Sequence, residues 1–319
     1  MRIAAQALSD GHHVRATVRK RQQAENVRSL VSREAPTDKL TFVQADLLAD
    51  EGWDEALAGA DYVIHAASPV ILGDVADEGV LVAPAVEGTK RVLRAAKNAN
   101  VRRIIVTSTA LIVAGHVTEG LAGPADFMPA DHPRVTPYAK SKIASEEVVR
   151  NFAAQHPTGP QVVTIHLGLI IGPPLDPEED SESIALCRGI CSGAQPSVPD
   201  FAFPMADVRD VARVHLSAMT SENMSISRYL VSFGTEPQQL PDIARILRAH
   251  GNSKASMLII PRFVLRLLAR FNREIRSNLK LSDGLSMRLD IEATKNDFGW
   301  QPMAFEASVL DTARAIQRS

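Results

Sequence analysis

Strand-like and helix-like stretches alternate along more than half of this chain, and this alternation constrains the fold most strongly. Nearly continuous apolar runs, DYVIHAAS at 61–68, RRIIVTSTA at 102–110 and QVVTIHLGLIIGPP at 161–174, are typical of strands covered on both faces. Between them, stretches such as VEGTKRVLRAAKNA at 86–99 carry apolar residues at helical spacing. Repeated βα units of this length predict an α/β fold with a doubly wound parallel sheet.

The pattern becomes irregular after residue 172. An acidic and then Pro-rich stretch at 173–205 follows neither period. Next, ADVRDVARVHLSAM predicts a helix with Asp207 at its N-cap and Asp210 in a capping-box-like position, and RYLVSFG predicts a strand that returns to the sheet. We therefore predict a first domain at 1–172, joined by 206–233, and a smaller, mostly helical lobe at 173–205 and 234–319.

Composition narrows the classes of function. The formal net charge of −2 gives no electrostatic reason to expect a nucleic-acid partner. No apolar run reaches the length of a transmembrane helix. The only cysteines, Cys187 and Cys191, are spaced as two small apolar residues on one helix face. We therefore expect no metal site and no disulfide, and we expect a cytoplasmic protein with no membrane span.

Two short motifs carry the chemistry. Tyr138 and Lys142 in YAKSK are four residues apart, so they share one face of a predicted helix. A cation near a tyrosine favours the phenolate and lowers a pKa that is ordinarily about 10. Thr109 ends a buried strand, where a hydroxyl could hydrogen-bond a substrate carbonyl that Tyr138 then protonates. Alone, the spacing also fits a surface Tyr–Lys pair, but the strand, the helix and the βα pattern occur in one consistent order.

At this point the sequence resembles a known family over nearly its whole length. It is similar to the extended short-chain dehydrogenases/reductases of the NAD-dependent epimerase/dehydratase superfamily, and most similar to the dihydroflavonol 4-reductase and aldehyde/ketone reductase branch. The matching motifs, in the family's order, are GHHVRATVR, QADL, DYVIHAASPV, VEGTKRVLRAA, IIVTSTA, PYAKSKIASE, LGLIIGPPL, ADVRDVA and NDFGWQPMAFEASVLDTA. Either chemical motif alone would be weak, whereas this series is specific.

The resemblance implies a Rossmann-type domain that binds a nicotinamide dinucleotide, with a smaller C-terminal substrate lobe. It implies that Thr109 stands where the family has its catalytic serine, that Tyr138 is the proton donor, and that Lys142 lowers the tyrosine pKa and holds the nicotinamide ribose. The residues that it places at the cofactor are Arg19, Lys20, Asp46, Leu47, Ala66, Ala67, Ser68, Ser108, Tyr138, Lys142, Leu167 and Gly168.

The basic cluster at the end of the second strand of the family pattern, Arg19 to Arg21, favours NADP over NAD. An acidic residue there would bind the ribose 2′-hydroxyl of NAD, whereas an arginine suits the 2′-phosphate of NADP. The alternative is that these residues form only a solvated turn. We predict NADP, with NADPH as the reductant.

The chain departs from the family pattern in several places. Thr109 replaces a serine and narrows the site by a methyl group, and Leu167 stands where proline is common. Arg91 replaces an asparagine, for which we expect a consequence in packing only. His166 is expected to be a packed histidine rather than a catalyst.

The largest departure is at the start of the printed sequence. The family begins with a strand and a G-x-x-G-x-x-G turn whose backbone approaches the pyrophosphate, and this sequence starts just past the last of those glycines. Because that strand is central in the sheet, its absence would leave two neighbours unpaired, which is costly for buried backbone. We therefore expect a start assigned too late, or a fragment.

The favoured function is an NADPH-dependent reductase of an aldehyde or ketone. The alternatives are an NAD-dependent sugar-nucleotide epimerase or dehydratase, a hydroxysteroid dehydrogenase, and a non-catalytic dinucleotide-binding protein or inactive fragment. Loops at 115–136 and 173–205 and the C-terminal lobe would select the substrate, with Phe201, Phe203 and Met205 as apolar candidates. The resemblance also suggests a homodimer through the helix that carries Tyr138.

A last feature lies outside the family motifs. PRFVLRLLARFNREIR places Arg262, Arg266, Arg270 and Arg273 on one face of a predicted helix with apolar residues between them. This pattern is typical of an amphipathic helix with a solvated basic face, and the alternative is a contact with a membrane surface or an acidic partner.

Overall fold

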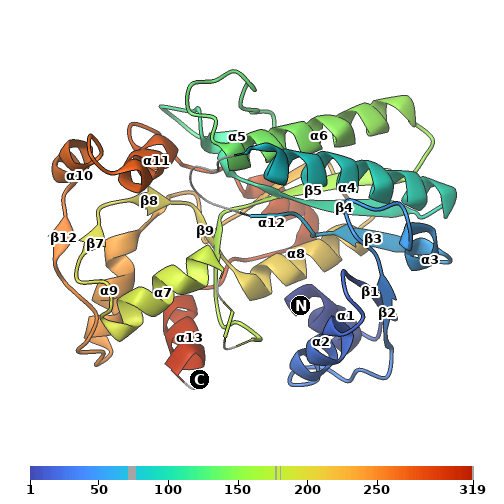
Figure 1. Ribbon diagram of the computed structural model, residues 1–319, viewed down its shortest axis with the longest axis horizontal. Coiled ribbons are helices and arrows are strands. Elements are labelled where there is room, and N and C mark those ends of the chain that lie inside the picture. The colour runs from blue at the N-terminus through green and yellow to red at the C-terminus, as the bar shows by residue number, and fades with distance from the viewer. Residues whose placement is uncertain (71–76, 177, 180, 318–319) are drawn as a thin grey trace.

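Helices cover both faces of a parallel sheet in the computed structural model (Figure 1). The structure describes residues 1–70, 77–176, 178–179 and 181–317, and only the backbone of residue 274. The main sheet has the order β10-β5-β4-β3, and every neighbouring pair is parallel. Its strands are β3 (Tyr62–His65), β4 (Arg103–Thr109), β5 (Gln161–Leu167) and β10 (Arg228–Val231). The predicted doubly wound α/β class is confirmed.

A second, two-stranded parallel sheet consists of β1 (Val14–Val18) and β2 (Leu40–Gln44). Among the described residues, β1 pairs only with β2 and β3 pairs only with β4, so these six strands do not form one continuous sheet. Arg15 of β1 links the two sheets, because its Nη1 atom donates to the carbonyl oxygens of Ala56 at 3.1 Å and Ala58 at 2.6 Å, which shortly precede β3.

The helices that cover the main sheet form two layers. α4 (Gly79–Asn98) and α6 (Pro137–Gln155) pack together on one face. α8 (Val208–Thr220) covers the other face, with α1 (Arg2–Ser9) and α12 (Glu292–Phe298) against it. Shorter helices complete this part: α2 (Gln23–Val31), α3 (Trp53–Leu57) and α5 (Leu111–Ala114).

The start of α8 confirms one predicted cap and corrects another. The carboxylate of Asp207 accepts a hydrogen bond from the backbone N–H of Arg209 at 2.7 Å, as an N-cap does. Asp210 does not complete a capping box. Its carboxylate accepts from Trp300 Nε1 at 3.1 Å and from the backbone N–H of Met303 at 2.8 Å. It therefore ties α8 to the C-terminal part of the chain, a partner that local spacing could not reveal.

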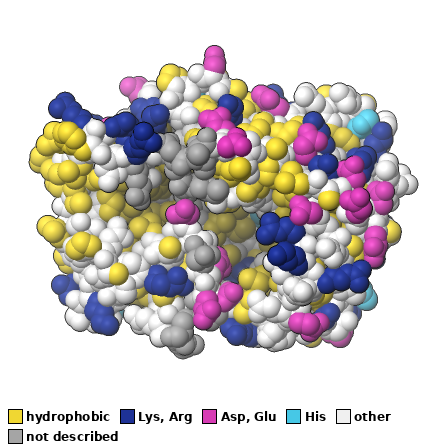
Figure 2. Space-filling model, in the orientation of Figure 1, with side chains coloured by type: hydrophobic (Ala, Val, Ile, Leu, Met, Phe, Trp, Pro, Cys, Tyr) yellow, Lys and Arg dark blue, Asp and Glu magenta, His cyan; other side chains and the backbone are white. Residues whose placement is uncertain are grey.

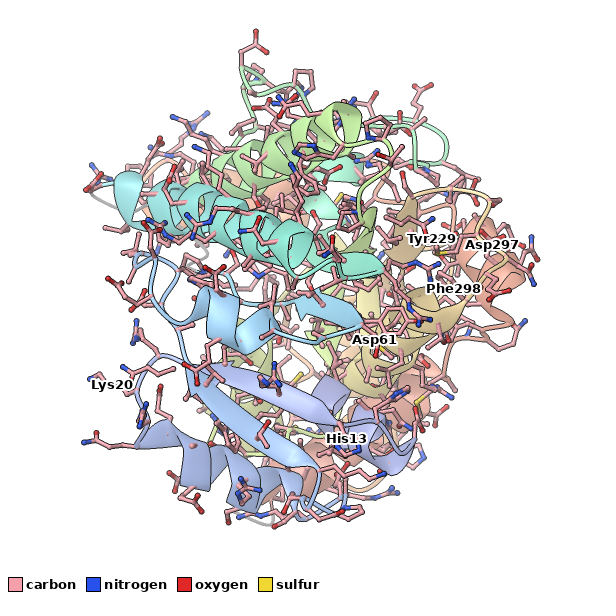
Figure 3. All side chains as sticks on the ribbon, turned by 90° about the vertical axis from the view of Figure 1, so that its right-hand side faces the viewer. His13, Lys20, Asp61, Tyr229, Asp297 and Phe298 are labelled. Atoms are coloured by element: carbon pink, nitrogen blue, oxygen red, sulfur yellow. The ribbon has the colours of Figure 1, made fainter. Side chains whose placement is uncertain are left out.

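The outer strand β10 is held by α12. The hydroxyl of Tyr229 donates to the carboxylate of Asp297 at 2.6 Å, and its ring centroid lies 4.4 Å from that of Phe298 (Figure 3). The same view places Lys20 at the other side of the molecule, beyond the end of β1.

The rest of the chain builds a second apolar core. Its helices are α7 (Glu182–Ser192), α9 (Leu240–Ala249), α10 (Arg262–Leu268), α11 (Arg273–Ser282) and α13 (Phe305–Gln317). Its short strands are β6 (Leu169–Ile171), β7 (Val198–Pro199), β8 (Ala202–Phe203), β9 (Met205–Asp207), β11 (Gln238–Gln239) and β12 (Ile259–Ile260). Cys187 and Cys191 are free and buried in this core, and burial raises their pKa values to about 12 and about 11. They pack as small apolar residues, as predicted.

The single basic helix predicted over 262–273 is wrong. α10 ends at Leu268, and α11 starts at Arg273 after the N-cap Asn272, whose side chain accepts a hydrogen bond from the backbone N–H of Ile275 at 3.0 Å. The capping side chain starts a new helix there, so the arginines are divided between two elements. Within the described part of the chain, no helix has both the length and the apolar character to cross a bilayer.

Candidate active site

The helix α6 fixes the position of the predicted acid. The side chain of Thr136 accepts a hydrogen bond from the backbone N–H of Ala139 at 3.2 Å, and Pro137 follows in the first turn, where a missing N–H costs nothing. Tyr138 lies in that first turn and Lys142 one turn later. Lys142 is only 7% exposed. The cap therefore places both side chains at the end of the helix that adjoins β4 and α5.

Thr109 and Tyr138 meet, as the sequence predicts. Thr109 is the last residue of β4, at the carboxyl end of the main sheet, opposite Leu167 of β5. Burial raises the pKa of Tyr138, and the neighbouring side chain of Thr109 opposes this rise. The tyrosine is therefore a protonated hydroxyl at neutral pH, held beside a second hydroxyl.

The predicted lowering of the tyrosine pKa by Lys142 is not what the structure shows. The Nζ atom of Lys142 lies 5.9 Å from the centroid of the Tyr138 ring, and no attraction from it offsets the raised pKa of the tyrosine. Burial also lowers the pKa of Lys142 itself, to about 8. Burial disfavours the phenolate and the ammonium alike, because each loses its water.

A buried polar network behind β4 was missed by sequence reasoning. Glu146, one turn beyond Lys142 on α6, accepts from Arg228 Nε at 2.7 Å and from the Ser108 hydroxyl at 3.3 Å. Its other near neighbour is His166 Nε2, at 3.5 Å. The only sequence signal was the recurrence of polar residues at four-residue steps, Tyr138, Lys142 and Glu146, along one helix face.

Two buried histidines complete the surroundings of Lys142. His166 is within 3.4 Å of the carbonyl oxygen of Thr109 through its Nδ1 atom, and burial lowers its pKa to about 3. His65, at the end of β3, lies 3.4 Å from the hydroxyl of Thr89, and burial and the charge of Lys142 lower its pKa to about 4. Both imidazoles are neutral at physiological pH, and His166 is the packed histidine that was expected.

The residues expected along the cofactor follow the carboxyl ends of successive parallel strands. Asp46 and Leu47 follow β2, Ala66 to Ser68 follow β3, and Leu167 ends β5 next to Gly168. In an α/β sheet this edge is where ligands bind. The hydroxyl oxygen of Ser68 is buried and has no hydrogen-bond partner among the described residues, so it is available to a polar group of a ligand. These residues fit a dinucleotide.

Gly168 and the segment that contains Leu47 are also fixed by packing. A Cβ atom at Gly168 would lie 2.5 Å from the carbonyl oxygen of Pro204, so only glycine allows the chain before β9 to pass this closely. Arg91 donates to the carbonyl oxygen of Leu47 at 3.0 Å and pairs with Asp50 at 2.6 Å. It therefore fixes the segment after β2, which is the packing role predicted for it.

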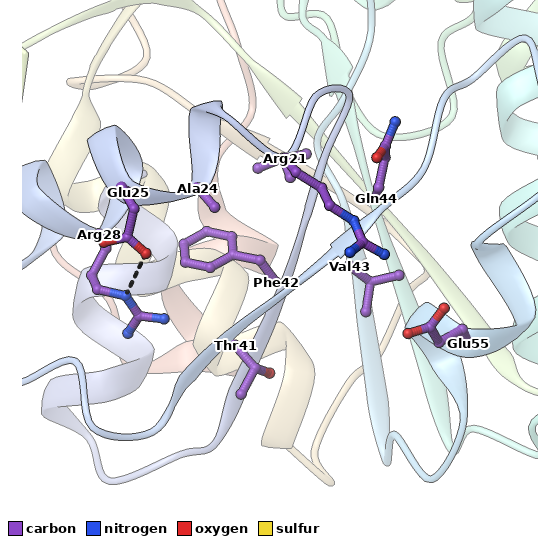
Figure 4. A pocket seen from close by; sticks show the side chains of 10 residues that line it. Arg21, Ala24, Glu25, Arg28, Thr41, Phe42, Val43, Gln44 and Glu55 are labelled. Atoms are coloured by element: carbon purple, nitrogen blue, oxygen red, sulfur yellow. Dashed lines mark ion pairs between the residues drawn. The ribbon is translucent and has the colours of Figure 1, made fainter.

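The basic cluster lies on the turn after β1, and its three side chains are exposed. The carbonyl oxygen of Arg19 accepts from Gln44 Nε2 at 3.2 Å, which ties the turn to the end of β2. Arg21 lines a surface pocket of about 520 Å³ together with Phe42, Gln44 and Glu55 (Figure 4). The side chains of Arg19 and Lys20 form no hydrogen bond or ion pair with the described residues, so they are open to a ligand.

Comparisons with known proteins show the family of this chain. Residues 2–231 match the sequence model of the NAD dependent epimerase/dehydratase family. The chain belongs to this family. Cinnamoyl-CoA reductase CAD2 of Medicago truncatula is 30% identical over 252 residues, which cover 76% of this chain and 74% of that protein. An anthocyanidin reductase of Vitis vinifera is 26% identical over 257 residues, covering 75% and 74%.

The fold is similar to that of a solved reductase. The crystal structure of yeast methylglyoxal/isovaleraldehyde reductase Gre2 complexed with NADPH superposes with a TM-score of 0.80 at 20% identity, over 99% of this chain and 94% of that one. The predicted family, the Rossmann-type fold and the predicted class, an NAD(P)-dependent oxidoreductase acting on carbonyl groups, are confirmed.

Proposed function

We propose that this chain reduces an aldehyde or ketone with NADPH. The observation that carries the proposal is that the side chains of Thr109 and Tyr138 adjoin at the carboxyl end of β4, with Lys142 buried one helical turn away. When bound, the dinucleotide supplies the hydride for the carbonyl carbon. Tyr138 donates its proton to the carbonyl oxygen, and its raised pKa keeps that proton in place until the oxygen becomes negative. The Thr109 hydroxyl orients the same oxygen.

Preference for NADPH is part of this proposal. The side chains of Arg19 and Lys20 are exposed at the end of β1, without partners in the described chain, and a guanidinium suits a 2′-phosphate. The Gre2 structure contains NADPH, in line with this choice. We propose the remaining contacts as the resemblance places them: Asp46 and Leu47 at the adenine, Ala66, Ala67 and Ser68 under the cofactor, Ser108, Leu167 and Gly168 near the nicotinamide, and Lys142 on its ribose.

The division of labour within the chain is also proposed. Residues 1–172 with 206–233 would hold the cofactor, while 173–205 and 234–319 would form the substrate lobe around the second core. Residues 177, 180, 318 and 319 lie outside the described part of that lobe. Phe201 and Met205 are buried in that core, so Phe203, which is half-buried, is the better candidate for substrate contact. A homodimer through α6 and a cytoplasmic location are proposed as well.

Binding and turnover test the proposal separately. Calorimetry with NADPH and NADH should give tighter binding of NADPH. Oxidation of NADPH should then be followed by absorbance with methylglyoxal, isovaleraldehyde and cinnamoyl-CoA, the compounds named for the relatives. Tyr138→Phe should keep NADPH binding and lose turnover. Full turnover in Tyr138→Phe, or binding of neither dinucleotide, would contradict the proposed reductase.

A further inference from the structure

The helix α10 has two apolar faces. Leu265 and Ala269 are 2% and 8% exposed and belong to the second core. On another face, Phe263 and Leu267 are four residues apart and are 72% and 55% exposed, and Phe271, in the turn that follows the helix, is 87% exposed. A surface helix of a globular protein ordinarily carries polar residues opposite the core. This face therefore carries apolar side chains that the described chain leaves in water.

These side chains belong to a larger exposed cluster, which we call the tip patch. Its members are Met257, Leu258, Phe263, Leu267, Leu268 and Phe271, each at least 40% exposed. Figure 2 shows hydrophobic side chains gathered at the end of the molecule where Figure 1 places α10, with lysine or arginine side chains bordering them. Contiguous apolar surface with a polar rim marks an interaction site.

Arginines border the tip patch, and only some of them are occupied. Arg266 pairs with Asp283 at 2.8 Å, and Arg276 Nε donates to the carbonyl oxygen of Ala269 at 2.9 Å at the end of α10. Arg270 and Arg273 form no hydrogen bond or ion pair with any side chain that the structure describes, and both are exposed. Two free guanidinium groups thus lie within two residues of Phe271, the most exposed aromatic side chain of the patch.

We propose that the tip patch docks on an anionic lipid surface. Phenylalanine and leucine side chains on one face of a short helix can enter the boundary between headgroups and acyl chains, while neighbouring arginines bind the negative headgroups. In a two-fold contact between copies of this chain, the same arginines of the two copies would instead lie opposite one another. The repulsion between their like charges would oppose such a contact. The charge of the rim therefore favours a negative surface over a second copy.

Vesicle flotation tests this directly with the full chain. We expect binding to vesicles of phosphatidylcholine with about 30% phosphatidylserine, and at least about tenfold weaker binding to phosphatidylcholine alone. Raising the salt from about 0.1 M to about 1 M should weaken the binding, because it screens the headgroup charge. Absence of binding to the anionic vesicles would overturn the proposal.

Matched variants separate the two contributions. Phe263→Ser with Phe271→Ser should weaken binding to anionic vesicles at least about tenfold, whereas Val80→Ser with Leu121→Ser, at two other exposed apolar positions, should not. Arg270→Gln with Arg273→Gln should remove the preference for anionic lipid, whereas Arg94→Gln with Arg102→Gln, an equal change of charge elsewhere, should keep it. All of these side chains are exposed, so the fold should persist, as circular dichroism can verify. Equal losses in test and control variants, or a dimer in light scattering that only Phe263→Ser with Phe271→Ser dissociates, would show that the patch does not bind lipid.

Discussion

The two ends of the proposed cofactor site differ in their access to water. At the carboxyl end of β4, Ser108 and Lys142 are 8% and 7% exposed, and burial shifts the pKa values of Tyr138 and Lys142. At the turn after β1, Arg19 and Lys20 are exposed. A charge in the first region costs folding free energy whether or not a ligand is present, whereas a charge in the second costs almost nothing until a ligand meets it. Substitutions should therefore change catalysis and stability together at β4 and only ligand preference at the turn.

The largest effect is expected from Tyr138→Phe. Loss of the proton donor should lower kcat about 10²–10⁴-fold, the usual contribution of a general acid. Steady-state kinetics with NADPH and a saturating carbonyl substrate measure it. The matched control is Tyr229→Phe, which removes a hydroxyl bonded to Asp297 at 2.6 Å outside the site. That variant should lose about 1 kcal/mol of stability and keep its kcat. Comparable kcat values in the two variants would contradict the assignment of Tyr138 as the catalytic tyrosine and Tyr229 as a structural one.

Lys142→Met should lose activity and gain stability. Burial lowers the lysine pKa from 10.5 to about 8. Between these values the unfolded chain holds the proton that the folded chain has released, so wild-type stability should rise with pH across this window. Below pH 8 the full cost of the buried charge is present, about 3 kcal/mol from the size of the shift. In denaturant unfolding at pH 7, the free energy of unfolding of Lys142→Met should exceed that of the wild type by up to that amount. The variant should not show the increase in stability that the wild type shows at higher pH. A less stable variant would mean that the ammonium has a partner in solution.

These two residues were accessible from the sequence because their contact is local. Tyr138 and Lys142 share one helix face, and a buried apolar run ending in Thr109 predicts a strand whose end faces a ligand. Glu146 and Arg228 could not be paired in the same way, since they are 82 residues apart in sequence and meet only after β10 joins β5. The break at Asn272 depended on one capping side chain within a continuous apolar period. The direction of the tyrosine pKa shift depends on how deeply its hydroxyl is buried, and the spacing of residues in the sequence does not show this.

At the exposed turn, Arg19→Gln should change cofactor preference alone. A hydrogen bond to a charged group contributes about 1.5–3 kcal/mol, so the ratio of NADPH to NADH affinity should fall roughly tenfold to a hundredfold. Calorimetric titrations with both dinucleotides give the ratio, and the melting temperature should stay unchanged. Arg102→Gln, at another exposed arginine, should leave the ratio as it is. An unaltered ratio in Arg19→Gln would mean that this arginine belongs only to a solvated turn.

The smallest effect on activity is expected from Glu146→Gln, which tests how far the catalytic centre extends along α6. Glu146 touches Ser108 and Arg228 but neither Thr109 nor Tyr138 directly, so it is a positioning residue. Glutamine keeps an acceptor for both partners, and kcat should fall only a few-fold with KM unchanged.

Burial raises the pKa of Glu146 above its usual 4.5, against the opposing effect of Arg228. The folded chain therefore binds the proton more tightly than the unfolded chain, and wild-type stability should fall as pH rises just above 4.5. In Glu146→Gln that slope should disappear while the pair with Arg228 weakens. A slope that persists would place the titrating group elsewhere, and a loss of kcat as large as that of Tyr138→Phe would extend the catalytic centre along α6 to Glu146.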